Sequence, residues 1–175
     1  YGYDPVSGRE LWKLSYGMQG FSNASRPIAG HGLVYVCTGY MNAQMLAIRV
    51  DQKQRGSQAE VVWSLRKQVP NVSSPLMVGQ EIYFVSDNGI ASCIDAKTGK
   101  VHWVQRIGTK FWASPLYADG RIYFFGSEGD TAVIEPGTSF RRLASNQLDG
   151  TMLATGAAVD GSLVLRTDQA VYCLR

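Results

Sequence analysis

The feature that most constrains the fold is a repeat of about 40 residues. Four short apolar runs, LVYV, IYFV, IYFF and LVLR, begin at positions 33, 82, 122 and 163, so their starts lie 49, 40 and 41 residues apart. Trp63 and Trp103 are also 40 residues apart, and a further step of 40 lands on the apolar Leu143. A fixed period of this size predicts a structural unit that stacks on copies of itself.

The first interval is longer because of a polar segment. The letters DQKQRGSQAE occupy residues 51–60, and the other repeats reach their Trp without such a segment. We therefore expect an inserted surface loop, whose removal leaves the fold intact because loop length changes the closure entropy only slowly.

Each repeat reads as four strands. Short runs rich in Val, Ile, Tyr, Phe and Trp alternate with Gly-containing turns, and no segment sustains a period of 3.6 residues. Four antiparallel strands in about 40 residues are typical of a β-propeller blade. We predict an all-β propeller with about four blades, three of them complete and one split between the termini. The expected divisions are 1–21 (partial), 22–71, 72–111, 112–152 and 153–175 (partial).

A nonapeptide occurs twice, as DPVSGRELW at 4–12 and DAKTGKVHW at 95–103. An Asp or Thr at a turn accepts hydrogen bonds from backbone N–H groups nearby, and a Gly supplies the positive φ that closes a hairpin. A Trp that wedges between neighbouring blades buries about 150–250 Å². The motif therefore predicts blade packing and no reaction centre. The predicted packing residues are Asp4, Gly8, Trp12, Trp63, Asp95, Thr98, Gly99 and Trp103.

These motifs resemble the A-x-D-x-x-T-G-x-x-x-W repeat of the pyrroloquinoline-quinone (PQQ)-like β-propeller family. The stretch SSPLMVGQEIYFVSDNGIASCIDAKTGKVHW is similar to one whole repeat, and the ending DGSLVLRTDQAVYCLR resembles that of BamB-like bacterial propellers. The resemblance covers essentially the whole chain and implies the C-terminal part of a larger, periplasmic or otherwise extracytoplasmic propeller. The segment 136–143, PGTSFRRL, departs from the pattern because it lacks both the Thr-Gly turn and the Trp.

The resemblance also raises the question of a cofactor. PQQ-dependent dehydrogenases of this superfamily hold the quinone and Ca²⁺ with carboxylate and amide ligands, a stacking Trp and often a vicinal disulfide. This sequence has no adjacent Cys pair, and no ligand set can be matched to it. We therefore predict no catalytic, cofactor-binding or metal-binding residues and no cofactor.

The remaining candidates have structural interpretations beside the functional ones. Trp112 is expected to pack in the core or a loop, with a place at the pore mouth as the alternative. His31 is expected in an exposed turn, and His102 to point away from the face that carries Trp103. Glu128 and Asp130 fall in a turn, where Ca²⁺ binding is the less favoured interpretation.

Two further observations bound the function. Cys37, Cys93 and Cys173 are an odd number without a CxxC pattern and are expected to be strand thiols. The net charge is +3, with 17 basic and 14 acidic residues scattered along the chain, which argues against a nucleic-acid partner. No apolar run approaches the roughly 18 residues of a membrane span.

Two classes of function remain. We favour a non-catalytic scaffold that binds an unknown protein partner for assembly, and the alternative is part of a PQQ- and Ca²⁺-dependent dehydrogenase. We also expect the split blade to be completed by self-association. Joining the ends within one chain gives a ring of four blades, and exchange between two chains gives the favoured dimer with eight.

Overall fold

The computed structural model describes residues 1–17, 20–51 and 58–175, and its regular elements are all β-strands. Three consecutive sheets each contain four antiparallel strands in sequence order. The first sheet contains β3 (Ile28–Gly30), β4 (Leu33–Cys37), β5 (Met45–Asp51) and β6 (Gln58–Leu65). The second contains β7 (Leu76–Val78), β8 (Glu81–Val85), β9 (Ile90–Asp95) and β10 (Val101–Arg106). The third contains β11 (Leu116–Ala118), β12 (Arg121–Phe125), β13 (Asp130–Glu135) and β14 (Arg141–Gln147).

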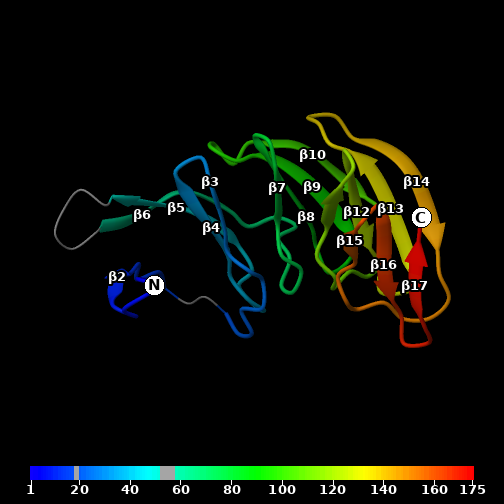
Figure 1. Cartoon of the computed structure of the whole chain (residues 1–175). Coiled ribbons are helices and arrows are strands. Elements are labelled where there is room, and N and C mark those ends of the chain that lie inside the picture. The colour runs from blue at the N-terminus through cyan, green and yellow to red at the C-terminus, as the bar shows by residue number, and fades with distance from the viewer. Residues whose placement is uncertain (18–19, 52–57) are drawn as a thin grey trace.

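The sheets stand side by side as the blades of an open arc (Figure 1). The first strands β3, β7 and β11 lie next to one another, so they form the inner side, and β6, β10 and β14 form the opposite edges of their sheets. This arrangement confirms the predicted all-β propeller architecture.

The core is divided among the interfaces between successive sheets. One cluster of buried side chains joins the first sheet to the second, and it includes Tyr35, Met45 and Phe84. The next cluster joins the second sheet to the third, with Tyr83 and Phe124 fully buried. A smaller cluster around Phe125 and Leu165 joins the third sheet to the fourth. Each apolar run of the repeat therefore contributes to the packing between blades.

Two incomplete sheets lie at opposite ends of the arc (Figure 1). The N-terminal hairpin pairs β1 (Gly2–Tyr3) with β2 (Glu10–Trp12). The last sheet contains β15 (Ala157–Val159), β16 (Ser162–Arg166) and β17 (Val171–Leu174). Within the described residues the two ends form no common sheet, so the four-bladed ring within one chain is not formed. Exchange between two chains stays a prediction.

The polar segment lies mostly outside the described residues, which resume at Gln58. Strands β5 and β6 flank it and pair as far as Asp51 and Gln58. In the part of the chain that the structure describes, no helix is long and apolar enough to cross a membrane.

Candidate functional site

The predicted packing residue Trp63 lies between the first and second sheets. Its indole Nε1 donates a hydrogen bond to the Ala96 carbonyl at 3.1 Å. The Tyr35 hydroxyl donates to the same carbonyl at 3.0 Å, and the two ring centroids are 5.8 Å apart. Two aromatic side chains of one blade thus converge on one backbone oxygen of the next blade. We call such a pair a staple.

A second staple joins the second sheet to the third. Trp103 Nε1 donates to the Gly137 carbonyl at 3.0 Å, and the Gly137 N–H donates to the Tyr83 hydroxyl at 2.8 Å. The Trp103 ring also meets Phe140 edge-on, with centroids 5.1 Å apart. Burial raises the pKa of the Tyr83 hydroxyl well above its ordinary value, so this group stays neutral and hydrogen-bonded at physiological pH.

The turn of the repeated nonapeptide has a second role that sequence reasoning missed. Asp95 Oδ1 accepts hydrogen bonds from the Thr98 N–H at 2.8 Å and the Thr98 hydroxyl at 2.6 Å. Gly99 has a φ of 70°, and a Cβ added there would stand 2.7 Å from Cδ2 of Trp63. The turn therefore seats the Trp of the preceding blade, while its own Trp103 reaches the following one. The 40-residue spacing of the Trp residues was the signal for this reciprocal contact.

The N-terminal copy of the motif forms the same turn in different surroundings. Asp4 Oδ1 accepts hydrogen bonds from the Ser7 N–H at 2.7 Å and the Ser7 hydroxyl at 2.9 Å. A Cβ added at Gly8 would meet nothing within 4 Å, so no ring is seated there. The Trp12 indole lies against Gly2 of its own hairpin, and this copy therefore joins no two sheets in this structure.

The third interface lacks a staple, and its register corrects one sequence interpretation. Tyr123 pairs with Val133, as Tyr83 pairs with Cys93. However, Val133 pairs with Ala144, whereas Cys93 pairs with Trp103. Ala144 therefore occupies the Trp position. The expected equivalent, Leu143, is wrong by one residue because β14 is shifted by one residue against β13.

The titratable residues outside the staples show no catalytic grouping. No three His, Cys, Asp or Glu side chains among the described residues lie close enough together to hold a metal ion. These residues alone therefore do not fit the Ca²⁺ of the dehydrogenases. Burial raises the pKa of Asp130, and Glu128 Oε2 accepts a hydrogen bond from the Thr109 hydroxyl at 3.2 Å. No third carboxylate, Cys or His in the described chain joins Asp130 and Glu128.

The histidines and cysteines lie apart from one another. His31 has a φ of 53°, and its Nε2 is 2.9 Å from the Gly79 carbonyl, so the ring links two inner hairpins. His102 occupies the irregular position opposite Cys93 and Ile94, where β10 bulges. Cys37 and Cys93 are free thiols, and burial raises the pKa of each to about 12. Both thiols are therefore protonated and unreactive at neutral pH.

The loops that lead into β7, β11 and β15 form a distinct surface. Each exposes one apolar side chain at an equivalent position, namely Val72, Trp112 and Leu153, with exposed fractions of 37%, 42% and 50%. Trp112 is thus exposed, and the expectation that it packs in the core is wrong. Lys110 Nζ lies 5.1 Å from the centre of its ring. We call these three side chains the apolar loop row.

A relay of hydrogen bonds holds these loops together. The backbone N–H of Arg26 donates to the Ser74 hydroxyl, that of Ser74 to the Ser114 hydroxyl, and that of Ser114 to the Thr155 hydroxyl, each at 2.9 Å. The acceptors lie 40 and 41 residues apart, so the relay repeats once per blade. It fixes the apolar loop row on a scaffold of four sheets.

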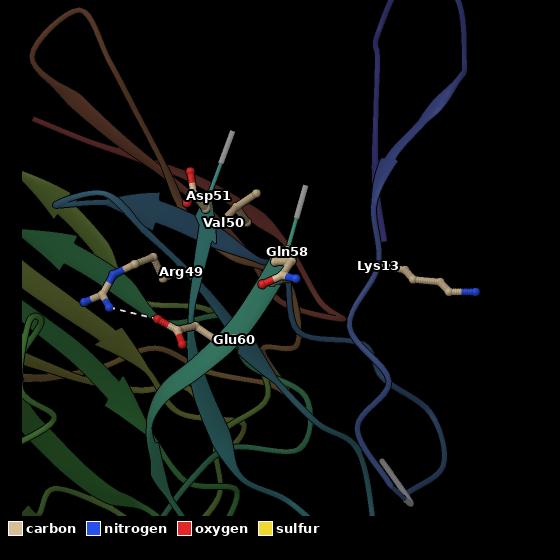
Figure 2. Close-up of a pocket in the computed structure, with 7 residues that line it drawn as sticks. Lys13, Arg49, Val50, Asp51, Gln58 and Glu60 are labelled. Atoms are coloured by element: carbon tan, nitrogen blue, oxygen red, sulfur yellow. Dashed lines mark hydrogen bonds and ion pairs between the residues drawn. The ribbon is translucent and has the colours of Figure 1, made fainter. Parts of the chain in front are cut away.

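A cavity of about 570 Å³ lies beside the ends of β5 and β6 (Figure 2). Arg49 and Glu60 form an ion pair there at 2.9 Å, with exposed side chains, and Lys13 points away from them in the view. Exposed ion pairs contribute little to stability and activate no group. The cavity offers no recognisable chemistry.

Comparison with known proteins places the chain in a family. The family model described as outer membrane protein assembly factor BamB matches residues 1–175. A search of curated proteins gave no match. Among solved structures, the chain is similar to BamB from Moraxella catarrhalis, with a TM-score of 0.70 and 16% identity over 95% of this chain and 48% of that one.

Dehydrogenases have similar structures too. A europium-containing methanol dehydrogenase gives a TM-score of 0.64 at 18% identity, covering 81% of this chain and 27% of that one. The quinohemoprotein alcohol dehydrogenase from Comamonas testosteroni gives 0.62 at 14% identity, covering 81% and 28%. The chain thus spans about half the length of the BamB structure and little more than a quarter of each enzyme. At these identities the likeness shows the fold alone.

Proposed function

The chain belongs to the family of the outer membrane protein assembly factor BamB, and from this premise we propose that it is a non-catalytic scaffold that binds a protein partner during assembly. The observation that supports this most strongly is the apolar loop row. Exposed apolar side chains scattered singly are ordinary, but equivalent ones on neighbouring loops of one rigid surface are typical of a binding face.

The contacts of the row suggest how it recognises a partner. Trp112 offers a large, half-exposed ring with a cation beside it, which is the type of side chain that dominates interface energies. Val72 and Leu153 flank it on loops that the hydroxyl relay ties to its own loop. Because these loops are held before a partner arrives, binding costs little ordering entropy. The partner surface is therefore apolar and spans several blades.

A crosslinking experiment tests this proposal. A photoreactive amino acid is placed at position 112 and, as a control, at position 104, because Val104 is equally exposed on β10 at 50%. The proposal expects a discrete adduct with one protein at position 112 only, and its loss when Leu153→Ser is added. Equal labelling at both positions, or no adduct at position 112, contradicts it.

The compartment and the other partners follow from the family in the same proposal. We place the protein in the periplasm or another extracytoplasmic space, with no nucleic acid among its partners. Fractionation of native cells, with detection of the chain by antibody, tests the compartment. Recovery with cytoplasmic markers contradicts this part.

The alternative function is that of a quinone-dependent oxidoreductase, favoured by the structural likeness to the two dehydrogenases. In this alternative the ligands for PQQ and Ca²⁺ come from residues outside this chain. Dye-linked oxidation of an alcohol or sugar after PQQ and Ca²⁺ are added to the longest available form of the protein tests it. A rate above that of the protein without PQQ favours the enzyme, and no difference favours the scaffold.

A further inference from the structure

A groove runs along the inner side of the arc, over the starts of β7 and β11. It has a volume of about 580 Å³, within the range of small-ligand sites. Its polar lining comes from Arg26, Ser74, Ser114, Tyr117 and Thr155, and the remaining lining residues are Pro, Leu and Met. Every polar side chain in the lining has an N–H or O–H to donate, and none is a carboxylate or an amide.

The donors of this groove are unused within the protein. The hydroxyl oxygens of Ser74, Ser114 and Thr155 each accept a backbone N–H at 2.9 Å. Among the described residues, none of the three donates its own O–H, and Arg26 takes part in no ion pair. The relay therefore fixes each oxygen in place and leaves its proton directed elsewhere.

Arg26 breaks the repeat at this position. The chain reads Ser25-Arg26-Pro27 in the first blade and Ser73-Ser74-Pro75 in the second, so a guanidinium stands where the next blade has a hydroxyl. Arg26 is exposed, with no acidic side chain beside it in the groove. A guanidinium matches a carboxylate with two parallel hydrogen bonds. The groove thus combines one fixed cation with a row of neutral donors above an apolar floor.

We propose that this groove binds a carboxylate, with Arg26 pairing with the charge and Ser74 and Ser114 donating to the carboxylate or to neighbouring oxygens of the same ligand. Two sources supply this chemistry, namely a free small carboxylic acid and an acidic side chain of an extended peptide. The inference goes beyond the scaffold function, because a free carboxylate fills the groove without any contact to the apolar loop row.

Titration of the chain of residues 1–175, followed by amide and guanidinium NMR signals, tests the site. Succinate is compared with succinamide, its neutral isostere, at matched ionic strength. A capped peptide of alternating Ala and Glu is compared with its Ala and Gln counterpart. We expect succinate, the Glu peptide or both to shift the signals of Arg26, Ser74 and Ser114, and the neutral compounds to leave them in place.

Matched variants separate the site from general charge. Arg26→Gln lies at an exposed position and should keep the fold, whereas Arg9→Gln makes the same charge change on the N-terminal hairpin. Loss of a charge-assisted pair should weaken binding about tenfold or more in Arg26→Gln, and Arg9→Gln should bind like the parent. Ser114→Ala, used if its melting curve is unchanged, should weaken binding by a smaller factor.

The outcomes decide both the site and its ligand. Shifts with succinate alone assign a free carboxylic acid, shifts with the Glu peptide alone assign an acidic peptide, and either supports the site. The proposal is overturned if neither carboxylate moves the groove signals, if the neutral compounds move them equally, or if Arg26→Gln binds like the parent. None of these outcomes depends on crosslinking at position 112, so this proposal and the scaffold function fail separately.

Discussion

The interface between the second and third sheets and the one between the third and fourth use the same strands differently. In the former, Trp103 and Tyr83 meet the backbone of Gly137 with hydrogen bonds of 3.0 and 2.8 Å. In the latter, Ala144 stands where the Trp stood, and Tyr123 borders a cavity of about 680 Å³ between the two sheets. The buried cluster there is also smaller.

This difference teaches which part of the repeat joins the blades. The apolar runs recur in all four sheets and build each blade. The staple needs three further features: a Tyr on the second strand, a Trp on the fourth, and a turn of the next blade that presents a carbonyl. Where the Trp and the turn are missing, the sheets still stand side by side (Figure 1), but the space between them is not filled.

The largest expected effect comes from removing a stapling ring. Trp103→Ala should lower the free energy of unfolding by about 3–5 kcal/mol, because the ring fills the space between two blades. Trp112→Ala is the control and should cost no more than about 0.5 kcal/mol, because that ring is exposed. Urea unfolding measures both. A loss below about 1 kcal/mol for Trp103→Ala would show that the staple is not needed for stability.

The next effect isolates the Tyr hydroxyl. Tyr83→Phe leaves the Gly137 N–H without its acceptor and should cost about 1–2 kcal/mol. Tyr123→Phe makes the same change at the third interface, where no backbone group of another blade meets the hydroxyl among the described residues. It should be close to neutral. Equal losses for the two variants, measured by urea unfolding, contradict the comparison.

A third change introduces the missing ring. Ala144→Trp places an indole on the strand position that Trp103 occupies in the second sheet, beside Tyr123. The aromatic pair should raise the free energy of unfolding by up to about 1 kcal/mol. Leu143→Trp is the matched control and should give no gain, since position 143 is not the equivalent one. A gain from Leu143→Trp alone would restore the assignment made from spacing.

The smallest effect concerns the turn. Hydrogen bonds from Thr98 lower the pKa of Asp95 below its ordinary value. The resulting stabilisation is therefore present at neutral pH and is lost as the pH falls through the lowered pKa. Asp95→Asn should remove this acid-side loss, with a cost at pH 7 under about 1 kcal/mol because the carboxylate is largely solvated. Thermal melts between pH 2 and pH 7, at roughly one-unit steps, measure the slope. An unchanged slope argues against the turn assignment.

Much of the fold was predictable because its signals are local and repeated. The β-propeller followed from strand-length apolar runs such as 82–85 and 122–125 at a fixed spacing. The turn of Asp95, Thr98 and Gly99 followed from residue types with known turn chemistry.

Other features were not predictable because they depend on register and on neighbours in space. Spacing alone points to Leu143, and only the pairing of Val133 with Ala144 shows the one-residue shift. The contact of Trp63 with Gly99 and the relay from Arg26 to Thr155 join blades that are separate in sequence. Exposure of Trp112 depends on how its loop leaves the sheet, which a single sequence does not specify.

Native-state hydrogen exchange tests most directly whether staples make the blades a cooperative unit. The amides of β8 and β12 lie in sheets joined by a staple, and those of β16 lie in the sheet without one. We predict that β8 and β12 exchange through a common opening, and that β16 opens separately with a free energy lower by about 2 kcal/mol or more. Ala144→Trp should narrow this gap. Exchange of β16 at the same free energy as β8 and β12 would contradict the account.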